Sequence, residues 1–200
     1  MGPAFGSTVV RLLMGLALSS CAAAPAIDLS STTFPAVGIE RISVPGLAVT
    51  IAPNAVSRRQ YHSGSPNYGL AYSVGDAERR YAQAVADAVF SGTPFDKTPS
   101  AGQTELRLTS FAHLLIPRST GTLPDVIDEV TAKWTLTGPT GNELRRFVFV
   151  GSRSSETRGG LAPAQAERGQ VRANAAIQDL FHRTVEGLAS APEFAQIKAR

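Results

Sequence analysis

The sequence predicts an α+β fold, a two-layer sandwich in which about four mostly antiparallel strands carry two helices on one face. Three features predict it: stretches in which apolar and polar residues alternate, two apolar stripes with helical spacing, and a short turn between two strand-like stretches. Two helices that each have one apolar stripe can both cover the same face of an antiparallel sheet. The expected order of elements is β-α-β-β-β-α.

The first predicted strand spans residues 39–51. Its alternation changes register at Pro45 and Gly46, which indicates a bulge or a bend. The first predicted helix follows between Asp76 and Ser91, where apolar residues recur at helical spacing from Tyr81 to Val89. Asp76 is a suitable N-cap, and Gly92 followed by Pro94 is a typical helix end.

Three further strands are predicted over residues 106–116, 126–136 and 144–152, and the turn at residues 138–142 favours an antiparallel hairpin between the last two. In the first of them the alternation places one set of residues toward the core: Leu106, Leu108, Ala112, Leu114 and Ile116. A closing helix is expected from Val171 to Ser190, before Pro192. The sheet face turned away from the helices is expected to be polar. Its predicted residues are Arg107, Thr109, His113, Glu129, Thr131, Lys133 and Thr135.

The composition is that of an ordinary globular domain. The chain has 200 residues, of which 43% are hydrophobic and 18% charged, and its formal net charge is only +3. Nucleic-acid binding calls for basic residues clustered on one face, so no nucleic-acid partner is expected. Because Cys21 is the only cysteine, an intrachain disulfide or a thiolate metal cluster is excluded.

Residues 1–20 have the layout of a secretory signal peptide. Arg11 is followed by an apolar run from Leu12 to Leu18 and by two small residues. The run is too short to cross about 30 Å of hydrocarbon as a permanent helix. These residues are therefore expected to be removed and to take no part in the fold.

Leu18, Ser19, Ser20 and Cys21 resemble the bacterial lipobox, in which an aliphatic residue and two small residues precede a lipid-modified cysteine. The resemblance implies a diacylglycerol on the sulfur of Cys21, which becomes the new N-terminus. Two or more acyl chains anchor a protein stably. Ala22, where an aspartate would signal retention at the inner membrane, implies the periplasmic face of the outer membrane. The other interpretation is that Cys21 is only a small residue near an ordinary cleavage site.

The sequence thus divides into a signal peptide at residues 1–20, the acylated cysteine with a flexible tether at residues 21–38, and a single α+β periplasmic domain at residues 39–200. The tether is inferred from small and polar residues, two prolines and the lack of any period.

The body of the chain is similar to small envelope lipoproteins with βαβββα topology. The pattern is a helix beginning near Asp76, the stretch 131–137 followed by a glycine-containing turn, and a closing helix from Ala173. It resembles the lipopolysaccharide-assembly lipoprotein of the outer membrane and the auxiliary lipoproteins of ABC-type lipid transport. The resemblance covers most of residues 39–190 and implies an accessory role in envelope transport or assembly. It carries over no functional residue other than Cys21.

The sequence contains no common catalytic or phosphate-binding motif. His62, His113 and His182 lie in a predicted loop, strand and helix, so their spacing indicates no metal site. The acidic group Asp125, Asp128 and Glu129 is expected to be a solvated strand end. No catalytic residue, metal or cofactor is therefore predicted.

Two loops are candidates for binding. Residues 53–74 form a long predicted loop that contains Arg58, Arg59, Tyr61, Tyr68 and Tyr72, residue types enriched at binding hot spots. It either binds a partner or folds back to cover the sheet edge. A second basic loop, residues 153–168, is expected to be mobile.

These observations predict a non-enzymatic lipoprotein that is held at a membrane by its lipid and that binds or helps to assemble an envelope protein. One alternative is a carrier for a lipid or other amphiphile, which would need an apolar cavity between helices and sheet. A hydrolase is a third possibility. It would need a histidine in a cleft, within reach of both a carboxylate and a hydroxyl group.

Overall fold

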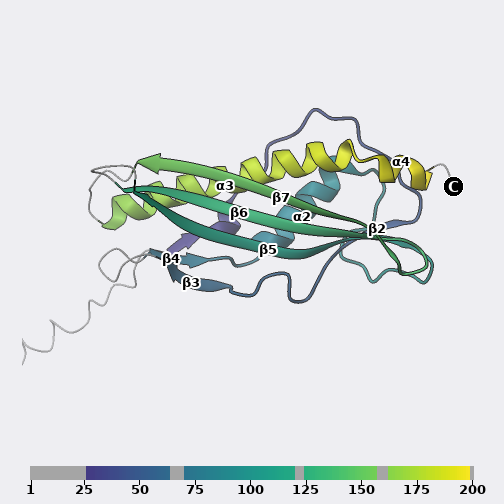
Figure 1. Ribbon diagram of the computed structural model, residues 1–200, viewed down its shortest axis with the longest axis horizontal. Helices are drawn as coiled ribbons and strands as arrows, with labels where there is room; N and C mark the ends of the chain where they lie inside the picture. Colours follow the sequence, from purple (N-terminus) through teal and green to yellow (C-terminus); the bar gives the residue numbers. More distant parts are fainter. Residues whose placement is uncertain (1–25, 64–69, 120–123, 157–161, 199–200) are drawn as a thin grey trace, which may run out of the picture.

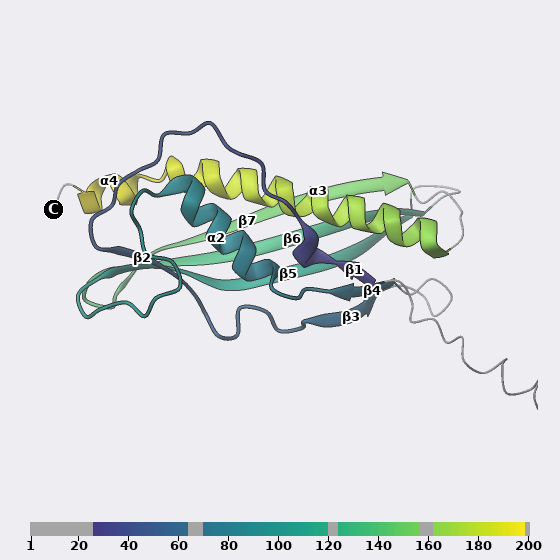
Figure 2. The same cartoon turned by 180° about the vertical axis from the view of Figure 1, so that it is seen from behind.

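A computed structural model describes residues 26–63, 70–119, 124–156 and 162–198. It confirms the predicted α+β two-layer sandwich, with helices on one face of a four-stranded sheet (Figures 1 and 2). The elements are β1 (Ala26–Asp28), η1 (Leu29–Ser31), β2 (Leu47–Ile51), β3 (Gln60–Ser63), β4 (Leu70–Ser73), α2 (Ala77–Val89), β5 (Thr104–Ser119), β6 (Pro124–Thr137), β7 (Glu143–Glu156), α3 (Ala162–Ala189) and α4 (Pro192–Lys198).

The large sheet has the strand order β2-β5-β6-β7. Strand β2 is parallel to β5, because the chain between them crosses over through α2, and the other pairs are antiparallel. A small second sheet, with the order β1-β4-β3, was not predicted. Figure 1 looks onto the face of the large sheet that carries no helix, and Figure 2 looks onto the face covered by α2 and α3.

The N-terminal part of the described chain differs from the prediction of a flexible tether. Ile27 and Leu29 are fully buried. The backbone N–H of Asp28 donates to Oε1 of Gln170 at 2.8 Å, and Nε2 of Gln170 donates back to the carbonyl of Asp28 at 2.8 Å. Residues 26–32 therefore belong to the folded domain, which begins well before residue 39.

Helix α3 begins nine residues earlier than expected and takes up part of the predicted second basic loop. Alanine, glutamine, glutamate and arginine dominate residues 162–170, and all four favour helix. Strand β7 takes up the other part of that loop, as far as Glu156. Pro192 does not simply end the helix, since it opens the short helix α4.

The core lies between the helices and the large sheet, around the fully buried Trp134, Tyr81 and Phe181. The hydroxyl of Tyr81 lies 2.5 Å from Oγ1 of Thr184, which ties α2 to α3. Burial raises the pKa of Tyr81 far above its usual value, so this hydroxyl stays neutral.

The register of β5 shifts between Leu108 and Ser110, and this bulge reverses the predicted facing of the rest of the strand. Leu106 and Leu108 point into the core, as expected. Beyond the bulge Phe111 is buried, whereas Leu114, predicted to face the core, is 56% exposed.

Helix α3 crosses β7 at very close range. A Cβ atom added to Gly151 would lie 2.2 Å from the backbone nitrogen of Leu180 and 2.3 Å from the carbonyl oxygen of Ala176. Only glycine leaves room for this approach, so Gly151 fixes how deeply the helix packs on the sheet.

We expect Gly151→Ala to lower the free energy of unfolding by about 3 kcal/mol, at the upper end of overpacking effects, because the added methyl group meets backbone that has to move. Urea unfolding measures the change. The matched control is Gly38→Ala, since a Cβ at Gly38 meets nothing within 4 Å. Equal stability of the two variants would show that α3 does not approach β7 this closely.

Candidate functional site

The predicted binding loop at residues 53–74 is in part a β-hairpin, β3 and β4, paired with β1. The aromatic and basic residues whose side chains are described do not form one surface. Tyr72 is 1% exposed and packs in the core. Arg59 is exposed but pairs with the buried Glu78, with 2.6 Å between Nη2 and Oε1. The segment is therefore in part a component of the small sheet, with Tyr72 packed in the core.

The remaining predicted site residues are described only in part. Arg58 is exposed beside Arg59. Tyr61 lies on β3 opposite Tyr72 in register. Tyr68 lies outside the described residues, as does the predicted lipidation site Cys21. Whether Arg58, Arg59 or Tyr61 contacts a partner remains a prediction.

The uncovered face of the large sheet is less polar than predicted. Leu114 is 56% exposed, Val148 54% and Val150 38%. They lie in adjacent rows of the ladder: Leu114 opposes Glu129, Val150 opposes Thr131, and Val148 opposes Lys133. The face is therefore an apolar patch interleaved with polar side chains, produced in part by the bulge that turns Leu114 outward.

His113 was predicted on this outer face, and the same bulge turns it inward. Its side chain is 0% exposed, and its Nε2 lies 2.5 Å from Oδ1 of Asp128, which is also 0% exposed. The other carboxylate oxygen of Asp128 accepts a hydrogen bond from Nε of Arg172 on α3. Asp128 is therefore buried, and the prediction of a solvated acidic strand end is wrong for this residue.

Tyr72 completes this buried cluster, with its ring centroid 4.8 Å from that of His113. Burial raises the pKa of Tyr72 far above its usual value, and the charge of Asp128 raises it further, so Tyr72 stays neutral. The cluster joins β4, β5, β6 and α3. His113 meets the carboxylate that a hydrolase would need, but its side chain has no exposed surface. This arrangement fits a structural role in the core better than a catalytic role.

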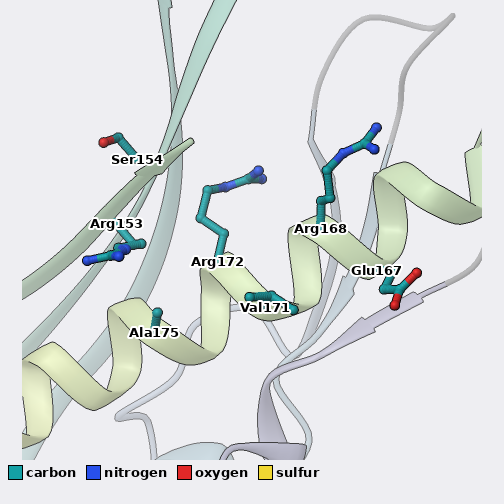
Figure 3. A pocket seen from close by; sticks show the side chains of 7 residues that line it. All are labelled: Arg153, Ser154, Glu167, Arg168, Val171, Arg172 and Ala175. Carbon is teal, nitrogen blue, oxygen red and sulfur yellow. The ribbon is translucent and has the colours of Figure 1, made fainter. Parts of the chain in front are cut away.

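A pocket of about 570 Å³ lies between the end of β7 and the first half of α3 (Figure 3). Its lining residues are Arg153, Ser154, Glu167, Arg168, Val171, Arg172 and Ala175. Arg168 and Arg172 are one helical turn apart, and Arg153 lies across from them on β7. Arg172, held by Asp128, is shared with the buried cluster.

The sequence contained part of the signal for these features. The alternation of β6 places Asp128 on the same side as Val130, Ala132 and Trp134, which indicates an inward carboxylate. Its partners come from a strand with a bulge and from a helix 44 residues away in sequence, which no local pattern reveals. The pocket was missed because Arg153 and Arg168 were assigned to a loop, whereas they lie on β7 and α3.

We expect Asp128→Asn to lower the free energy of unfolding by about 3 kcal/mol, because Arg172 would keep a buried charge without its counter-ion. Glu129→Gln is the neighbouring control on the other sheet face, where a change within about 0.5 kcal/mol is expected. Chemical denaturation of both variants provides the comparison. A stable Asp128→Asn protein would contradict a supporting role for the cluster.

No protein-family model matches the sequence, and no curated protein matches it. Among solved structures, the rare lipoprotein B from Shewanella oneidensis is similar, with a TM-score of 0.50 and 11% identity over 75% of this chain and 98% of that chain. The minor lipoprotein from Acinetobacter baumannii gives a TM-score of 0.47 and 13% identity over 78% and 94%. A neuraminyllactose-binding hemagglutinin homolog from Helicobacter pylori gives 0.48 and 14% over 84% and 98%. Within the described residues no helix is long and apolar enough to span a membrane. At these identities the similarity is one of fold, and it is a fold that the rare lipoprotein B adopts.

Proposed function

We propose that this protein is an acylated, non-catalytic lipoprotein that docks a protein partner of the bacterial envelope through the uncovered face of its large sheet. The observation that carries the proposal is the patch formed by Leu114, Val148 and Val150, three large apolar side chains exposed on a face that no helix covers. Polar residues between and around apolar ones are typical of interfaces whose partners also exist apart.

The proposed anchor is Cys21, on the strength of the lipobox and the signal layout before it. The fold shared with a bacterial lipoprotein supports the same assignment. Ala22 after the cysteine favours the outer membrane. The partner is expected to present apolar side chains to the patch, because charged groups placed against it would lose their hydration without gaining a counter-ion.

Carriage of an amphiphile between helices and sheet is less well supported. Around Gly151 the contact of α3 with β7 leaves no space for even one added carbon, and Trp134, Tyr81 and Phe181 are buried between the helices and the sheet. The pocket of about 570 Å³ lies outside this core, toward the end of β7 and the beginning of α3. The structure therefore favours docking on the outer face over binding inside the sandwich.

For the anchor, we expect the wild-type protein to incorporate an alkyne analogue of palmitate in bacterial cells and Cys21→Ala to incorporate none, because the thiol is the acceptor. Intact-mass measurement should place the N-terminus of the mature wild-type protein at residue 21. Ser20→Ala, which keeps a small residue before the cysteine, should still be labelled. Equal labelling of wild type and Cys21→Ala would contradict the proposed anchor.

For the docking face, we expect a photo-crosslinking amino acid in place of Leu114 or Val148 to capture the same envelope protein in cells. Gln83, exposed on α2 in the opposite layer, is the control position and should not capture it. Leu114→Asp combined with Val148→Asp should lower recovery of that protein at least about tenfold, because two charges would be buried at the contact. Equal capture from Gln83, or full recovery with the double variant, would rule out this face.

A further inference from the structure

We propose that the pocket between β7 and α3 binds the phosphate group of an anionic membrane lipid. The pocket lies beside the covered face of the sheet and is separate from the patch proposed for docking. Its volume of about 570 Å³ is within the range of ligand sites and far above the roughly 30 Å³ of one water molecule. It is large enough for a phosphate group together with the glycerol to which it is joined.

The charge of the pocket suits a phosphodiester. Arg153, Arg168 and Arg172 all line it, and arginine binds phosphate through paired, planar hydrogen bonds. The side chain of Arg172 has a fixed position in the site, because it is only 8% exposed and is paired with Asp128. Among the described lining residues Glu167 is the only acidic one. Figure 3 shows its carboxylate well away from the guanidinium groups of Arg168 and Arg172.

The pocket also offers apolar contact, which distinguishes a lipid from a free phosphate ion. Val171 lines it and is 66% exposed, so its methyl groups are open to contact with a ligand. Ala175 follows one turn further along α3. A ligand with a phosphate next to acyl chains could use both kinds of contact at once.

The position of the pocket fits a lipid bound near the anchor, and this step rests on the proposed acylation of Cys21. Strand β1 contacts α3 within a turn of the pocket, since a Cβ on Gly169 would lie 2.4 Å from Cδ1 of Ile27. Ala26, where β1 begins, is five residues after Cys21. Five extended residues span at most about 18 Å, so the anchor would keep this end of the domain close to the bilayer.

The test is calorimetric titration of the purified full-length protein in nonionic detergent, with dihexanoylphosphatidylglycerol as the lipid probe and inorganic phosphate as the ion probe. We expect the lipid to bind at least about tenfold more tightly than the ion. Arg153→Gln and Arg168→Gln, on two different elements, should each weaken lipid binding about tenfold. Arg183→Gln, further along the same helix and outside the pocket, is the matched control and should change nothing. Val171→Ser should weaken binding of the lipid but not of the ion.

Equal affinity for the two probes would overturn the lipid assignment and leave a free-phosphate site. Absence of binding, or binding that neither Arg153→Gln nor Arg168→Gln weakens, would overturn the pocket itself. These titrations do not depend on acylation. A negative result would therefore leave the Cys21 labelling result standing, and a failure of labelling would leave the titrations interpretable.

Discussion

The carboxylate of Asp128 is the interaction on which the arrangement of this protein depends. It lies fully buried between His113 of β5 and Arg172 of α3, and Tyr72 of the small sheet packs on His113. A buried charge is tolerated only when its partners are in place, so each of these elements has one position relative to the others. The same contact fixes Arg172 at the pocket, so that the internal support and the edge of a binding site are one structure.

The sequence predicted the features that depend on neighbouring residues better than those that depend on residues far apart in the chain. The periodic spacing of apolar residues predicts helix α2 and predicts which side chains of β6 point toward the core, because each element buries one regularly spaced set of residues. The bulge in β5 has no such signature, and one extra residue was enough to exchange the positions predicted for His113 and Leu114. The inward position of His113 in the buried cluster and the outward position of Leu114 in the apolar patch are the two consequences of that exchange, and for this reason neither feature was predicted as it stands.

The N-terminal segment shows a second limit. Small residues and two prolines suggested a tether, yet Ile27 and Leu29 are buried and the backbone of Asp28 is matched by the amide of Gln170. Composition indicates what a segment can do alone, whereas these contacts depend on a helix more than 140 residues away in sequence. The hairpin β3-β4 was missed in the same way, since its strands are short and complete a sheet only together with β1.

The position of β1 in the fold would also determine how the domain is oriented at a membrane if Cys21 is acylated. A free tether reaching to residue 38 would let the domain tilt in any direction, whereas, with Cys21 acylated, the four residues between Cys21 and β1 would hold one end of the domain near the lipid. Figure 2 shows β1 and the beginning of α3 toward one end of the domain and α4 at the other. If Cys21 is acylated, the end of the domain that carries the pocket lies near the bilayer, and strands of up to 16 residues run from that end along the uncovered face of the sheet. The uncovered face of the large sheet would then be accessible to a protein partner, while the end of the domain that carries β1 contacts lipid. The reason is that a short connection to the acylated cysteine restricts the orientations of the domain.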